Sequence, residues 1–174
     1  MDEKIQLLSH KLSQQLRSRR ETLAVAESLT GGGLASEITE MEGASDIFLG
    51  GFIAYANSVK VDQLFLKALD IEKYGVVSKE IAMAMAESAR DQLGSTWALS
   101  TTGVAGPGRY KNGASGEEIS AGKVWIGLAG PSEINFLTVA QEFNFGEIGR
   151  NQVRRASIFG ALSLLELTLG ESAR

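Results

Sequence analysis

The sequence contains no cysteine, and His10 is the only histidine among its 174 residues. A chain without cysteine forms no disulfide, has no thiolate nucleophile and offers no thiolate ligand to zinc. One histidine in a polar N-terminal stretch is too little for a Ser-His-Asp triad or for a transition-metal site built on histidine. If the chain is a hydrolase, its base must therefore be a lysine, a tyrosine or a carboxylate.

The sequence also has no excess of positive charge, because it contains 17 basic and 21 acidic residues and its formal net charge is −4. This balance argues against a nucleic-acid partner. The N-terminal stretch lacks the apolar core of a signal peptide, and no apolar run approaches the roughly 20 residues of a membrane span. We therefore expect a cytoplasmic protein without a membrane partner. The length and the hydrophobic fraction of 44% suit a single domain over residues 1–174.

Apolar periodicity and turn residues predict helices that alternate with about five strands. The expected helices cover residues 3–19, 31–40, a segment from about 59 capped by Asn57 or Ser58, 79–93 capped by Ser78, and 148–169. The expected strands cover residues 22–26, 47–56, 97–101, 123–129 and 134–143, and a long loop covers 106–122. This order predicts an α/β fold of three layers, α/β/α, whose sheet is mixed but mostly parallel because its last two strands form a hairpin.

The last expected helix is apolar on nearly every side, as Val153, Ile158, Leu162 and Leu165 illustrate. A helix without a clear polar face lies in the core or at a subunit contact. We expect it to pack on the sheet, with part of its surface shared by a contact in a homodimer.

The segment around Ser28 is the first candidate functional feature. An apolar strand leads into Ser28 and Thr30, three glycines follow at 31–33, and a helical pattern begins directly after them. A glycine-rich turn before a helix leaves backbone N–H groups that bind anions, either a substrate phosphate or a developing oxyanion. Ser28 is then placed where a nucleophile can sit, although it can equally cap the helix while the glycines only shape the turn.

Tyr55 and Lys60 lie at the next strand–helix junction, and residues 102–108 form a third glycine-rich segment after a strand. Strand ends of an open α/β sheet commonly meet at one crevice. Without histidine, lysine is the natural base for a serine nucleophile, provided that burial lowers its pKa from about 10.4 to about 7–8. Tyr55 then relays the proton or holds the lysine. The alternatives are that Lys60 is a solvated helix residue and that Tyr55 belongs to the core or its rim.

Six short motifs together resemble the CinA C-terminal domain family of nicotinamide-nucleotide amidases. They run in order over residues 24–165 and are Ala26-Glu27-Ser28-Leu29-Thr30-Gly31-Gly32, the stretch 48–60, Gly75-Val76-Val77-Ser78, Thr102-Gly103-Val104-Ala105-Gly106-Pro107, Gly122-Lys123-Val124 and 149–154. Each motif is weak alone, but the ordered set is highly specific.

The resemblance implies an amidase of pyridine-nucleotide salvage, which converts nicotinamide mononucleotide to nicotinic acid mononucleotide and ammonia without a metal or a cofactor. It makes Ser28 the nucleophile, Lys60 the base and Tyr55 the partner of the lysine. Backbone N–H groups around Thr30–Gly32 or Thr102–Gly103 are the candidates for holding the oxyanion. The residues expected to bind substrate are Thr30, Gly31, Gly32, Thr102, Gly103, Ala105, Gly106 and Arg150, with Arg154 as a second candidate for the phosphate.

Two departures from the family pattern leave other functions open. Leu29 replaces the usual cysteine, and residues 107–121 are longer and differently composed, so that closure of this loop can change the substrate. One alternative is a nucleotide-binding module that has lost turnover. The other is a Ser/Lys amidase that acts on a different amide.

Overall fold

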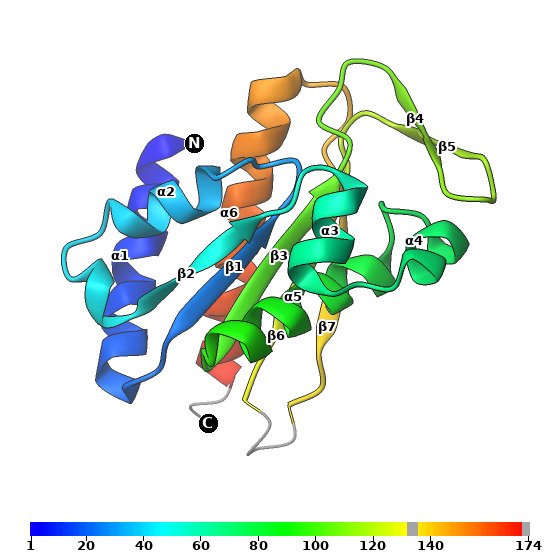
Figure 1. Cartoon of the computed structure of the whole chain (residues 1–174). Helices are drawn as coiled ribbons and strands as arrows, with labels where there is room; N and C mark the ends of the chain where they lie inside the picture. Colours follow the sequence, from blue (N-terminus) through cyan, green and yellow to red (C-terminus); the bar gives the residue numbers. More distant parts are fainter. Residues whose placement is uncertain (132–135, 172–174) are drawn as a thin grey trace.

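The computed structural model describes residues 1–131 and 136–171, and it is built around a five-stranded sheet with the strand order β2-β1-β3-β6-β7 (Figure 1). The strands are β1 Leu23–Glu27, β2 Phe48–Ile53, β3 Trp97–Gly103, β6 Lys123–Ala129 and β7 Val139–Asn144. The helices are α1 Asp2–Arg19, α2 Gly33–Thr39, α3 Asn57–Leu64, α4 Ala68–Tyr74, α5 Lys79–Leu93 and α6 Arg150–Glu171, with a short 3₁₀ turn, η1, at Ala44–Asp46. None of the described helices is long and apolar enough to cross a membrane.

The direction of the strands confirms a mixed, mostly parallel sheet. β1 pairs in parallel with both β2 and β3, whereas β6 is antiparallel to β3 and to β7. Because β7 reverses the direction of β6, four of the strands run the same way and only β6 opposes them. The carboxyl ends of β1, β2 and β3 therefore meet at one end of the sheet, where ligands bind in folds of this kind.

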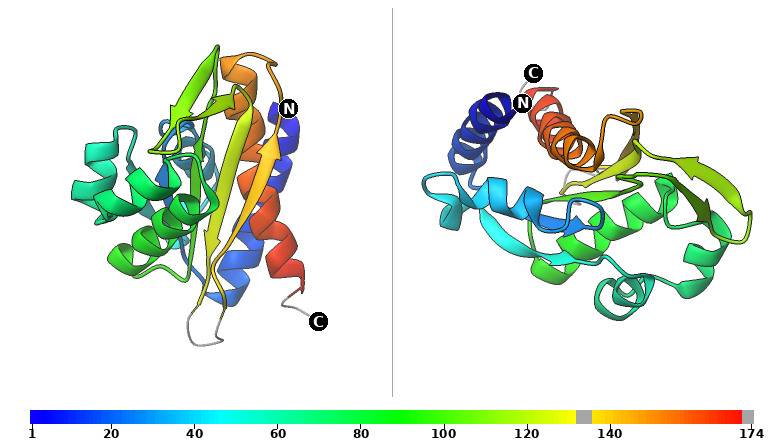
Figure 2. Two further views of the ribbon diagram at one scale, coloured as in Figure 1. Left: turned by 90° about the vertical axis from the view of Figure 1, so that its right-hand side faces the viewer. Right: turned by 90° about the horizontal axis from the view of Figure 1, so that it is seen from above.

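Helices cover both faces of the sheet, which confirms the three-layer α/β/α prediction (Figure 2). Leu23 and Val25 of β1 join a core cluster with α1, α2 and α6, while Ala24 and Ala26 face the opposite way toward α5. This division follows from the alternation of side chains along a strand. The small alanines of β1 let α5 pack closely on its face. The expected packing of the last helix on the sheet is confirmed, and its share in a dimer contact stays a prediction.

One close approach between neighbouring strands depends on a glycine. Gly51 of β2 is paired with Val25 of β1. A Cβ atom at Gly51 would lie 2.6 Å from the Val25 carbonyl oxygen and 2.3 Å from its Cγ2. Only glycine allows β2 to come this near to β1, and the end of β2 leads directly into the segment that carries Tyr55.

Several local predictions differ from the structure. α3 begins at Asn57 with Ala56 as its N-cap, so neither Asn57 nor Ser58 caps it, whereas Ser78 does cap α5 by accepting the Ile81 N–H at 3.3 Å. The predicted loop at 106–122 contains a two-stranded hairpin, β4 Arg109–Asn112 and β5 Glu117–Ser120. α4 was not predicted, because its seven residues span too few turns for a clear period. Residues 134–135 of the last predicted strand lie outside the described residues.

Candidate active site

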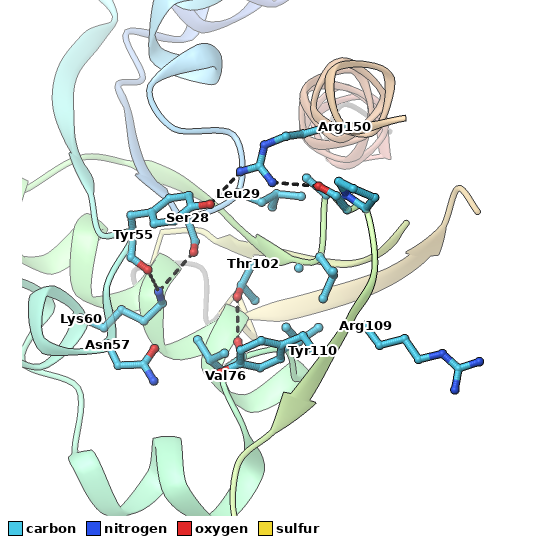
Figure 3. Close-up of a pocket in the computed structure, with 16 residues that line it drawn as sticks. Ser28, Leu29, Tyr55, Asn57, Lys60, Val76, Thr102, Arg109, Tyr110 and Arg150 are labelled. Carbon is cyan, nitrogen blue, oxygen red and sulfur yellow. Dashed lines mark hydrogen bonds between the residues drawn. The ribbon is translucent and has the colours of Figure 1, made fainter. Parts of the chain in front are cut away.

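Ser28 directly follows β1 and lines a cavity of about 310 Å³ at the carboxyl end of the sheet (Figure 3). Its backbone N–H donates to the Thr101 carbonyl of β3 at 2.9 Å. This bond continues the β1–β3 ladder by one residue, so the serine is fixed by the sheet although it lies outside the strand. The geometry places a hydroxyl at the strand end that the glycine-rich turn indicated.

Lys60 reaches Ser28 from the end of the first turn of α3, and its side chain is completely buried. Its Nζ donates to Ser28 Oγ at 3.2 Å, to the Ala54 carbonyl at 2.7 Å and to the Tyr55 carbonyl at 3.1 Å. All three acceptors are uncharged, so no carboxylate stabilises the ammonium form. Burial lowers the pKa of Lys60 to about 8. The lysine therefore has the depressed pKa that a serine-activating base requires.

Tyr55 holds the lysine through its main chain and points its side chain elsewhere. The Tyr55 carbonyl accepts from Lys60, whereas its hydroxyl accepts from Arg150 Nη2 at 2.8 Å (Figure 3). The phenol makes no hydrogen bond to Lys60 in the part of the chain that the structure describes. Tyr55 was expected either to relay the proton or to hold the lysine. The contacts fit the second role, and the Tyr55 carbonyl, not the phenol, holds Lys60.

Glu27, the last residue of β1, supports the turn that follows Ser28 and was not among the predicted site residues. Its carboxylate is completely buried and accepts the N–H groups of Gly32 at 3.0 Å, Leu34 at 3.0 Å and Ala35 at 2.8 Å. The N-terminus of α2 is therefore occupied by an anion of the chain itself. The expectation that these N–H groups receive a substrate anion is corrected by this contact. The sequence did contain a signal for this contact, because Glu27 lies just before the glycine-rich start of a helix and a carboxylate is favourable at a helix N-terminus.

Thr30, Gly31 and Gly32 do not line the cavity, and the Thr30 hydroxyl and the Gly31 and Gly32 N–H groups bond within the protein. Thr30 is buried and shares a hydrogen bond of 2.7 Å with the Thr101 hydroxyl. The Gly31 N–H donates to the Ser28 carbonyl at 3.1 Å, and Gly32 donates to Glu27. These three residues form the turn next to Ser28 and lie outside the cavity lining.

The opposite wall of the cavity contains the other predicted segment. Thr102, Gly103, Ala105 and Gly106 all line it, as expected from the strand end of β3. The Thr102 hydroxyl donates to the Val76 carbonyl at 2.7 Å, which leaves the backbone as the polar group that this wall presents. Eight further lining residues were not predicted as part of the site: Leu29, Asn57, Val76, Val77, Val104, Pro107, Arg109 and Tyr110.

The two candidate phosphate-binding arginines lie one turn apart on α6, and only Arg150 reaches the cavity. Arg150 bridges the Tyr55 hydroxyl and the Gly106 carbonyl, the latter at 2.9 Å. Arg154 instead donates to the Thr30 carbonyl at 2.6 Å beneath the glycine-rich turn. The structure therefore separates an arginine that lines the cavity from one that supports the turn.

The cavity lining carries positive charge only. Lys60, Arg109 and Arg150 contribute to it, and no carboxylate side chain does. Arg109 extends away from the other lining residues in Figure 3 and pairs with Glu118 at 2.7 Å. Among residues 1–131 and 136–171, no cluster of three or more histidine, aspartate or glutamate side chains is arranged to hold a metal ion. The site suits an anionic ligand held close to a Ser/Lys pair.

Known proteins match this chain over nearly its whole length. The model of the CinA C-terminal domain matches residues 5–169. A CinA-like protein of Synechococcus sp. (strain RCC307) is 48% identical over 157 residues, which cover 90% of this chain and 36% of that protein. A CinA-like protein of Acaryochloris marina is 45% identical over 169 residues, 97% of this chain and 38% of that protein. The chain thus spans little more than a third of the length of these curated relatives.

Solved structures share the fold. The competence/damage inducible protein CihA from Agrobacterium tumefaciens superposes with a TM-score of 0.85 at 29% identity, and the match covers 96% of each chain.

Proposed function

The chain belongs to the CinA C-terminal domain family, and we propose that it is a Ser/Lys amidase that hydrolyses nicotinamide mononucleotide to nicotinic acid mononucleotide and ammonia. One observation carries the chemistry: a buried lysine without an acidic partner lies 3.2 Å from the hydroxyl of a serine that lines a cationic cavity. A binding module has no need of such a pair. The proposal concerns the segment that the longer relatives share with this chain.

The reaction is an acyl transfer in two steps. Neutral Lys60 accepts the proton of Ser28 while Oγ bonds to the carboxamide carbon. The lysine then delivers that proton to the amine, the C–N bond breaks and ammonia leaves. In the second step water attacks the acyl-serine, Lys60 accepts its proton and returns it to Ser28 Oγ, and the acid is released.

We assign the oxyanion to two backbone N–H groups. Leu29 follows the nucleophile, and its N–H makes no hydrogen bond to the described residues. The Val104 N–H donates to the Lys123 carbonyl of β6, so the N–H of the preceding residue, Gly103, faces the opposite side, toward Ser28. Losing one donor of this kind typically slows a reaction by about 10² to 10³.

The anionic part of the substrate is assigned to the Arg150 end of the cavity. A phosphate accepts paired hydrogen bonds from a guanidinium, and no lining carboxylate repels it. The ribose then spans the distance between this arginine and the carboxamide at Ser28. This orientation uses both polar ends of the cavity at once.

The test is ammonia release from nicotinamide mononucleotide by the wild-type protein and by Ser28→Ala and Lys60→Ala, with nucleotide binding measured by calorimetry on each. We expect turnover in the wild type, none in either variant, and retained binding in Ser28→Ala. Ser36→Ala is the matched control, because this exposed serine of α2 lies outside the cavity.

The other outcomes point to the alternatives. Binding without wild-type turnover would favour a nucleotide-binding module. Turnover of other amides, without binding of this nucleotide, would favour a Ser/Lys amidase of different specificity.

A further inference from the structure

The hairpin β4–β5 is a fixed wall of the active-site cavity. Asn112 at the end of β4 is buried, accepts the Val77 N–H at 3.0 Å and donates to the Val77 carbonyl at 3.1 Å. The Ala114 N–H at the hairpin turn donates to the Glu72 carbonyl of α4 at 2.9 Å. These bonds anchor the hairpin to α4 and to the α4–α5 turn, so the side chains of β4 have a defined position over the cavity.

Tyr110 of β4 stands between two cavities. It lines the active-site cavity of about 310 Å³ and a second cavity of about 320 Å³, and Asn57 and Val76 are the other residues common to both. In Figure 3 Tyr110 lies beside Val76, on the side of the cavity away from Arg150. The Tyr110 hydroxyl makes no hydrogen bond to the residues that the structure describes. The ring therefore acts there by its volume and its flat face.

The second cavity differs in character from the first. Its lining includes the apolar side chains of Val61, Ala68 and Ile71 and a single charged residue, Glu72, while no lysine or arginine contributes. Such a cavity has room for uncharged apolar groups and does not favour a phosphate. An aromatic acyl group at Ser28 whose anionic edge faces Arg150 turns its opposite edge toward Tyr110.

We propose that Tyr110 is a specificity-determining residue that limits the acyl group at Ser28 to a single aromatic ring by closing the active-site cavity toward the second cavity. This inference rests on the proposed Ser/Lys chemistry, but not on nicotinamide mononucleotide being the substrate. Removing the ring joins the two cavities and admits a fused two-ring acyl group. Enlarging the side chain narrows the space that one ring occupies.

Activated esters test this directly, because they acylate a nucleophilic serine without requiring the nucleotide part of the substrate. Ser28 Oγ bonds to the ester carbon, 4-nitrophenolate leaves, and Lys60 takes the serine proton. The measured quantity is the ratio of kcat/KM for 4-nitrophenyl 2-naphthoate to that for 4-nitrophenyl benzoate, after subtraction of the rate of Ser28→Ala.

We expect this ratio to rise about tenfold or more in Tyr110→Ala and Tyr110→Leu, to fall in Tyr110→Trp, and to stay unchanged in Tyr110→Phe. Opposite shifts for smaller and larger side chains do not arise from a general loss of structure. Tyr74→Ala is the matched control, since Tyr74 has a similar exposure, 36% against 37%, and lies outside the active-site cavity.

The inference is overturned if the ratio stays constant in both Tyr110→Ala and Tyr110→Trp, or if Tyr74→Ala changes it equally. It is also overturned if no variant shows hydrolysis that depends on Ser28. Ammonia release from nicotinamide mononucleotide, measured on the same samples, separates the two proposals. If the ratio shifts as expected without that turnover, the proposed substrate fails and the role of Tyr110 stands.

Discussion

Lys60 Nζ lies 3.2 Å from Ser28 Oγ at the end of a side chain that is entirely buried. The Ala54 and Tyr55 carbonyls fix the amine, and the Ala54 N–H donates to the Glu27 carbonyl at 2.8 Å, which ties the segment after β2 to the end of β1. The position of the base relative to the nucleophile is therefore set by the sheet itself. A buried cation with only neutral acceptors also makes both activity and stability depend on pH.

The activity should follow the ionisation of Lys60. The base works only when neutral, and burial lowers its pKa to about 8. Below that value kcat/KM should rise about tenfold per pH unit, and it should level off above it. Lys60→Arg should lose activity throughout, because a guanidinium does not deprotonate in this range. The measurement is kcat/KM for the amide from pH 6 to pH 10; a flat profile would contradict the assignment of Lys60 as the base.

The stability of the protein should increase with pH as Lys60 loses its proton. The pKa of Lys60 is about 8 in the folded protein against 10.5 for an ordinary lysine, so between these values the unfolded chain binds the proton and the folded protein does not. The free energy of unfolding therefore rises with pH across this window, by about 3 kcal/mol in total. Below pH 8 the full penalty for the buried ammonium is present.

Lys60→Met isolates that contribution. The variant lacks the buried charge, so its advantage over the wild type should be largest at pH 7 and should shrink as the pH rises from 8 to 10.5. The carbonyls of Ala54 and Tyr55 lose a donor at every pH, which offsets part of the advantage without changing its slope. Urea unfolding of both proteins at pH 7, 8.5 and 10 measures the difference. A difference that does not change with pH would mean that the lysine is not desolvated.

Most of the predicted site residues that line the cavity follow the end of a predicted strand. Ser28 and Lys60 flank two strand–helix junctions, and Thr102–Gly106 follow β3, so the parallel order of β1, β2 and β3 brings them together. Predicting these positions required only the order of the helices and strands and the rule that ligands bind at the carboxyl ends of parallel strands.

Other features depend on side-chain directions that a linear pattern does not contain. Glu27 points toward the start of α2, which the glycine-rich turn alone suggested was free. Arg150 and Arg154 differ in function because packing fixes the rotation of α6 about its axis. The hairpin of β4 and β5 was not predicted, because each strand has only four residues, which is too few for a clear alternation of apolar and polar residues.

Glu27→Gln should weaken both the fold and the site. The amide keeps one acceptor for the N–H groups of Gly32, Leu34 and Ala35 but turns an NH₂ toward them, and the negative charge at the helix start is lost. We expect a loss of about 2–3 kcal/mol in the free energy of unfolding and a fall in kcat as the turn below Ser28 loosens. Urea unfolding and turnover measure the two effects. Glu40→Gln, an exposed glutamate at the other end of α2, is the control, and an equal effect there would argue against a specific role for Glu27.

Arg150→Met should affect binding more than chemistry, because Arg150 lies at the opposite end of the cavity from Lys60 in Figure 3 and bonds to Tyr55 and Gly106 instead of to Ser28. Loss of a charge-assisted contact to the phosphate should raise KM for nicotinamide mononucleotide about 10- to 100-fold with little change in kcat. Nicotinamide riboside, which lacks the phosphate, should be affected much less.

Steady-state kinetics on both substrates measure this split between KM and kcat. Arg109→Met is the matched control, since Arg109 also lines the cavity but is exposed and paired with Glu118. We expect it to change KM by no more than a few-fold, because exposed ion pairs contribute little. If Arg150→Met raises KM equally for the nucleotide and the riboside, the arginine shapes the cavity through Tyr55 and Gly106 and does not bind the phosphate.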